Sequence, residues 1–215
     1  MPNECSNTLT IAGDPYEISR FVKAVTVNCI NEETKAPETE IRILKSLYPC
    51  PAELYEVKAD FTEKPEMKAK YGASDWYEWC NRRWGTKWGD YEHLIPIHKE
   101  GESIAIFHFT SAWSPPIEGL AYVSKQFSSL SFVLSYEEGG MCFLGSTLII
   151  DGKVVSNSEG EYPDMDDYKV GDDDYDYDKH YEVLSENLAK CEQAVLAFLP
   201  KSHEQYGRQL RKTKV

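Results

Sequence analysis

The first 25 residues change from the hydrophobic period of a strand to that of a helix. Leu9 and Ile11 alternate with polar neighbours, which is typical of a strand with one buried face. Asp14 then suits an N-cap, and Pro15 suits the first helical position. The apolar residues that follow at helical spacing are Ile18, Phe21, Val22 and Val25. We therefore expect a strand that leads directly into an amphipathic helix.

Further along the chain the same patterns predict a second strand–helix series. Ser74 is a suitable cap for a Trp-rich helix that Gly85 ends, and Ser114 caps another helix. The strands expected around these helices cover 88–97, 104–109, 130–136, 141–150 and 153–156. Residues 31–73 contain four prolines among many charges and predict an insertion over the core.

This order of elements predicts an α+β fold. Strand, helix, two strands, helix and strand with right-handed crossovers give the ferredoxin-like arrangement, an antiparallel sheet with two helices on one face. We assign residues 1–158 to this domain, with the insertion at 31–73. A C-terminal helix is expected to add to it.

The C-terminal quarter divides into three parts by charge and periodicity. Residues 159–178 are strongly acidic, with Lys169 the only base, and predict a solvated loop. Residues 179–199 predict a helix packed on the same domain, and 200–215 form a basic tail. Apolar residues between 181 and 198 form a narrow seam, which would dock on the sheet or join two copies of the chain as a homodimer.

The net charge of −13 opposes unaided binding to phosphate backbones. It is compatible with solubility alone, and also with an acidic surface that attracts a basic host protein. The candidate partner-binding residues are Asp172, Asp173, Asp174, Asp176 and Asp178.

Two segments carry a family resemblance. Residues 3–13 read NECSNTLTIAG, and residues 75–88 read DWYEWCNRRWGTKW. These strings resemble the YubB-like group of ferredoxin-like proteins of bacterial plasmids and phages, although Glu4 stands where that family usually has Trp. The resemblance covers about 3–28 and 75–150. It implies a ferredoxin-like fold and a mobile-element origin, and it implies no reaction and no catalytic residue.

No catalytic, metal-binding or cofactor-binding motif is present. Phosphate-cradling loops and nucleophile elbows are absent, and the histidines and cysteines lack zinc-ligand spacing. The aspartates of 172–178 fail the EF-hand pattern because Tyr177 occupies the glycine position. Cys80 beside two arginines is a candidate low-pKa thiol, but a buried thiol is the simpler interpretation. We predict no catalytic residue, no metal and no cofactor.

Three functional hypotheses follow. The first is a noncatalytic phage or plasmid accessory protein that engages a host protein through an acidic surface, with counter-defence as its role. The second is a single-stranded nucleic-acid binder, because the chain holds one basic–aromatic cluster outside the tail. That cluster is Arg82, Arg83, Trp84 and Lys87. The third is a nucleotide or RNA processing enzyme, which a carboxylate beside His108 in a pocket would favour.

The chain is expected to act in the cytoplasm of a bacterial host. It has no apolar run long enough to span a membrane, and its N-terminus lacks the pattern of a secretory signal. Its six cysteines are scattered without a Cys-x-x-Cys pair, which favours reduced thiols.

Overall fold

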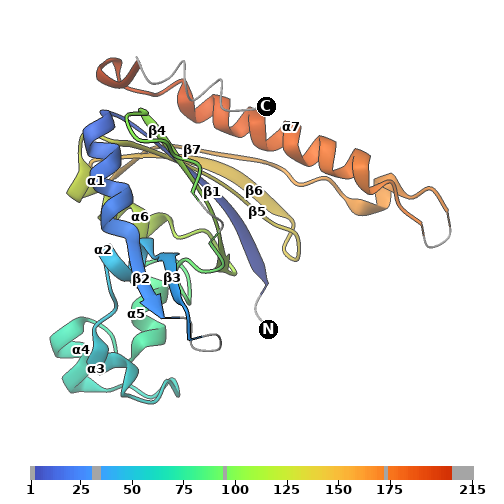
Figure 1. The fold of residues 1–215 in the computed structure, drawn as a ribbon. Coiled ribbons are helices and arrows are strands. Elements are labelled where there is room, and N and C mark those ends of the chain that lie inside the picture. The colour runs from blue at the N-terminus through green and yellow to red at the C-terminus, as the bar shows by residue number, and fades with distance from the viewer. Residues whose placement is uncertain (1–2, 31–34, 94–95, 172–173, 205–215) are drawn as a thin grey trace.

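The structure is a computed structural model that describes residues 3–30, 35–93, 96–171 and 174–204. A five-stranded antiparallel sheet forms its centre, in the order β4-β1-β5-β6-β7 (Figure 1). The strands are β1 (Glu4–Ala12), β4 (Ile104–Ala112), β5 (Ser131–Glu138), β6 (Phe143–Ile150) and β7 (Lys153–Glu161). The prediction of an α+β, ferredoxin-like antiparallel sheet is confirmed.

Two helices cover one face of this sheet, as expected. They are α1 (Pro15–Val25) and α6 (Ile117–Ser124), which is followed by the short helix η1 (Lys125–Phe127). Asp14 caps α1 by accepting a hydrogen bond from the Tyr16 amide. Phe21 lies at the centre of the core on this face, and its ring meets the edges or faces of Phe107, Phe127 and Phe132.

The main local difference from the prediction is at 88–97, where the expected strand does not form a regular ladder. Within the described residues this segment makes only two isolated antiparallel bridges to β4, Tyr91 to Thr110 and Ile97 to Ile106. It therefore follows the edge of β4, where a ferredoxin-like fold has its second strand. A regular ladder does not form there, because Glu92 takes a left-handed φ of 51° and Pro96 has no amide N–H to donate.

The predicted insertion is largely ordered. The described part contains strand β3 (Pro37–Ile41), which pairs with β2 (Thr26–Ile30) in a separate two-stranded sheet. It continues with the short helices α2 (Ile43–Leu47), α3 (Ala52–Tyr55) and α4 (Pro65–Tyr71). Helix α5 (Trp76–Arg83) follows, capped by Asp75 rather than by Ser74. These helices lie together below the sheet in Figure 1.

A third helix, α7 (Tyr177–Leu196), lies on the opposite face of the sheet. Val195 and Leu196 pack with Val133 and Leu148, whereas the neighbouring strand residues Phe132 and Ile149 belong to the core under α1 and α6. Because successive strand residues point to opposite faces, this places α7 on the face that α1 and α6 leave open. Leu184, Cys191 and Val195 of the apolar seam are therefore buried on this face, whereas Tyr181 and Phe198 are exposed. A homodimer through this helix stays a prediction.

The acidic segment is more structured than a loop. Its first residues belong to β7, and residues Met165–Tyr168 form the short helix η2, which Asp164 caps. The tail begins with η3 (Lys201–His203), and residues 205–215 lie outside the described part. No helix of the described residues is long and apolar enough to cross a membrane.

Candidate functional site

Three of the predicted partner-binding aspartates are described by the structure: Asp174 and Asp176 just before α7, and Asp178 in its first turn. Asp172 and Asp173 lie outside the described residues. Asp174 accepts a hydrogen bond from the Tyr175 amide, and Asp176 caps α7 by accepting from the Lys179 amide at 3.1 Å. Asp178 is exposed in the first helical turn, where a negative charge complements the helix dipole.

These aspartates belong to a larger surface, which we call the acidic surface. It includes the described acidic residues before and along the first half of α7, and three exposed apolar or aromatic side chains lie among them. The carboxylates are Asp164, Asp166, Asp167, Asp174, Asp176, Asp178, Glu182 and Glu186. The other three are Val170, Tyr177 and Tyr181, which are 65%, 52% and 60% exposed. Figure 1 shows this segment at the end of α7 that projects beyond the sheet.

The aromatic ring of the predicted nucleic-acid cluster is buried. Trp84 is only 1% exposed, and its Nε1 donates a 2.8 Å hydrogen bond to the Tyr48 carbonyl. A buried ring cannot stack on a base in this conformation. Arg82 is exposed and pairs with Glu78 at 3.0 Å. Binding of nucleic acid through Arg82, Arg83 and Lys87 stays a prediction, without Trp84 as its platform.

Two other residues singled out in the sequence have ordinary structural surroundings. Nδ1 of His108 lies 3.1 Å from the Thr8 hydroxyl across the β1–β4 ladder, so its hydrogen-bonding partner is a hydroxyl rather than a carboxylate. Contact with the Cys50 thiol and burial together hold the pKa of Cys80 well above its usual range. The low-pKa interpretation of Cys80 is therefore wrong, and the buried-thiol interpretation describes it.

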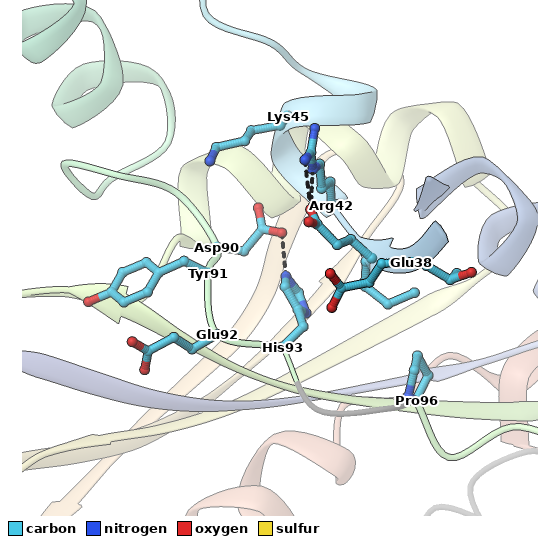
Figure 2. A pocket seen from close by; sticks show the side chains of 11 residues that line it. Glu38, Arg42, Lys45, Asp90, Tyr91, Glu92, His93 and Pro96 are labelled. Carbon is cyan, nitrogen blue, oxygen red and sulfur yellow. Dashed lines mark hydrogen bonds and ion pairs between the residues drawn. The ribbon is translucent and has the colours of Figure 1, made fainter. Parts of the chain in front are cut away.

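The sequence analysis missed a pocket of about 590 Å³ between β3, α2 and the segment that follows Gly89. Asp90 and His93 lie on its wall (Figure 2). The other charged residues of the lining are Glu38, Glu40, Arg42, Lys45 and Glu92. His93 Nε2 lies 2.6 Å from Asp90 Oδ2. This Asp-x-x-His spacing was the available signal, but such a spacing occurs often and indicates a site only when a cavity adjoins it.

Asp90 is buried, and its carboxylate has three hydrogen-bond partners. The amides of Ile43 and Leu44, at the start of α2, donate to it at 2.7 and 2.8 Å, and His93 is the third partner. Burial alone would raise the pKa of Asp90, but the His93 hydrogen bond and charge and the two amides outweigh it, and the pKa lies below its usual value. Asp90 is therefore a carboxylate at neutral pH.

His93 is held in place by this carboxylate and by the ring of Phe109. Its side chain is 7% exposed, and its ring centroid lies 5.2 Å from that of Phe109. The second ring nitrogen, Nδ1, is buried and has no hydrogen-bond partner among the described residues. Those residues contain no group of three or more His, Cys, Asp and Glu side chains that could hold a metal ion.

A family model supports the ferredoxin-like fold, and none of the comparisons with known proteins gives an activity. A family model described as the ferredoxin-like domain in Api92-like protein matches residues 83–180, somewhat less than half of the chain. The crystal structure of Api92 from Yersinia pseudotuberculosis is similar over 76% of this chain and 99% of that one, with 12% identity and a TM-score of 0.47. No curated protein matches. Residues 83–180 thus contain a ferredoxin-like domain similar to that of Api92-like proteins.

Proposed function

We propose that this protein is a noncatalytic binding module of a phage or plasmid, and that its acidic surface engages a basic protein of the bacterial host. The resemblance of residues 3–13 and 75–88 to the YubB-like group supports the mobile-element origin. Counter-defence, by occupying a host protein that would otherwise bind nucleic acid, is the role that this chemistry favours, because such proteins present basic surfaces.

One observation carries the proposal: apolar and aromatic side chains are exposed among the carboxylates. Acidic surfaces that serve solubility alone have no need of Tyr177, Tyr181 and Val170 on the outside. Protein interfaces combine the two, since aromatic side chains supply most of the binding energy and complementary charge supplies specificity and fast association. Tyrosine suits this role because it buries a large area with little loss of conformational entropy.

Hydrogen bonds and ring contacts also join the described part of the acidic surface to the rest of the protein. His180 lies beneath it, buried, with Nε2 3.1 Å from the Pro163 carbonyl, and the rings of Tyr162 and Tyr168 contact the imidazole. Asn187 donates to the Glu161 carbonyl at 2.9 Å and joins α7 to the end of β7. Such contacts reduce the entropy that these described residues would lose when a partner binds.

The test is affinity capture from a nuclease-treated bacterial lysate with three forms of the protein. The first is the wild type. The second carries Asp174→Asn, Asp176→Asn and Asp178→Asn, which removes three charges but keeps the caps, because Asn is as good an N-cap as Asp. The control changes three exposed carboxylates elsewhere, Glu56, Glu66 and Glu102, to Gln and removes the same charge.

We expect the wild type and the control to capture a partner that the Asp→Asn variant does not capture. This capture should weaken as salt is added. A second variant, Tyr177→Ala with Tyr181→Ala, should lose the same partner while keeping its charge. A partner captured equally by all forms, or no partner at all, would overturn the proposal. If the control also lost the partner, the loss of capture would result from net charge and would not involve the acidic surface specifically.

A further inference from the structure

A row of aromatic side chains on the surface joins the insertion to α5 and to the segment that follows it. Phe61 is 90% exposed and meets the Tyr77 ring edge to face, with centroids 5.9 Å apart. The ammonium group of Lys87 lies 5.9 Å from the centre of the Tyr77 ring and 4.5 Å from that of Trp88. Trp88 is 39% exposed. We call these four residues, Phe61, Tyr77, Lys87 and Trp88, the aromatic ridge.

The segment that carries half of the ridge is anchored from below. Thr86 is fully buried, and its hydroxyl donates to the Ala112 carbonyl at 2.7 Å and accepts from the Ala112 amide at 3.1 Å. Lys87 and Trp88 follow this anchor directly. Single exposed rings are ordinary at protein surfaces, whereas a contiguous row of them is typical of an interaction site.

A groove of about 400 Å³ adjoins the ridge, and both Phe61 and Tyr77 belong to its lining. The charged residues of this lining are Glu63, Lys68, Asp75, Glu78 and Arg82. Glu63 forms an ion pair with Lys68. Glu78 pairs with Arg82 at 3.0 Å, and Asp75 is buried as the cap of α5. Both solvent-accessible carboxylates of the groove are therefore neutralised by a neighbouring cation.

The local charge differs from that of the whole chain. Residues 81–88 contain three cations and no carboxylate, whereas the chain carries a net charge of −13. Among the described residues, Lys87 makes two ring contacts and no ion pair. The carboxylates of Glu4 and Glu92 lie near Tyr91, which is outside the ridge. The ridge thus combines exposed rings with a cation that has no counter-ion in the described part of the chain.

We propose that the aromatic ridge binds single-stranded nucleic acid, with bases stacked on Tyr77 and Trp88 and phosphates at Lys87 and Arg82. Exposed aromatic faces bind unpaired bases of any sequence, and neighbouring cations follow the phosphates. A phosphate is a stronger partner for an ammonium group than a ring face, so Lys87 leaves the ring face that a base then occupies. DNA and RNA strands share this chemistry. The site is separate from the acidic surface, and it does not depend on the proposed function.

The experiment is fluorescence anisotropy of the full chain with labelled oligothymidylate and oligouridylate of about 12 nucleotides, and with a DNA duplex of the same length. Trp88→Ala and Lys87→Met test the ridge, and Trp88→Phe keeps a ring at the same position. Tyr16→Ala and Lys23→Met are the matched controls, because both side chains are exposed on α1 and neither belongs to the ridge. Urea unfolding of each variant verifies that it is folded.

We expect saturable binding of a single strand, and much weaker binding of the duplex, whose bases are already stacked on one another. Two phosphate contacts on a single strand predict that the logarithm of the affinity falls with the logarithm of the salt concentration with a slope of about −1.4. Trp88→Ala should lose about tenfold or more in affinity, whereas Trp88→Phe should keep most of it. Lys87→Met should reduce the steepness of the salt slope by about 0.7, and both controls should bind as the wild type does.

Binding of both oligomers identifies a general single-strand site, and binding of one identifies the sugar that the ridge prefers. The proposal is overturned by the absence of saturable binding up to about 100 µM at low salt, or by equal affinity for the duplex. It is also overturned if Trp88→Ala loses no more affinity than Tyr16→Ala, or if Lys23→Met weakens binding as much as Lys87→Met.

Discussion

Removing the carboxylate of Asp90 should destabilise the protein more than an average substitution. In Asp90→Ala, the amides of Ile43 and Leu44 and Nε2 of His93 lose their acceptor. Each buried donor left unpaired costs about 1–3 kcal/mol, so we expect a loss of about 3–5 kcal/mol in the free energy of unfolding, after some relaxation. Most single substitutions cost about 0.5–3 kcal/mol.

Asp90→Asn separates the charge from the hydrogen bonds. The Asn oxygen still accepts from Leu44, and the His93 ring can change its tautomer to accept from the Asn amide. The Ile43 amide is then left facing a donor, so we expect a smaller loss of about 1–3 kcal/mol. Urea unfolding at neutral pH, followed by tryptophan fluorescence, measures both variants against the wild type.

The pH dependence gives the decisive control. Asp90 has a lowered pKa in the folded state, so its ionised form contributes stability at pH values above the ordinary aspartate pKa of about 3.9. This contribution is lost as the pH falls through the lower folded-state pKa, and Asp90→Asn never has it. The stability difference between wild type and Asp90→Asn should therefore narrow below about pH 4. A difference that stays constant into acid, or an Asp90→Ala loss under about 1 kcal/mol, would refute this account of Asp90.

Two further substitutions test the packing on the two faces of the sheet. A Cβ at Gly160 would lie 2.6 Å from the Leu144 side chain under α7, so Gly160→Ala should lower the free energy of unfolding by about 1–3 kcal/mol, measured by urea unfolding. Gly171→Ala is the control and should be close to neutral, because the nearest atom to its Cβ would lie at 3.4 Å. Phe21→Ala should lower the free energy of unfolding by about 3–5 kcal/mol in the same assay, because it empties the centre of the core. Phe198→Ala, at an exposed position, should cost far less. Equal losses within either pair of variants would contradict the packing described.

The fold was predictable because its signals are local. The alternation around Leu9 and the capped helix that begins at Pro15 need no information from the rest of the chain. Helix α7 was predictable for the same reason. The surface against which α7 packs was not predictable, because a narrow apolar seam is buried equally well by a sheet or by a second copy of the helix.

The pocket was not predictable because it depends on contacts between distant segments. The amide of Ile43 and the carboxylate of Asp90 are 47 positions apart, and only the return of the insertion to the edge of β4 brings them together. The same return places the Tyr48 carbonyl against Trp84 and buries the ring that the nucleic-acid hypothesis required at the surface. Sequence periodicity describes which face of an element is apolar, but it contains no information on which distant segment covers it.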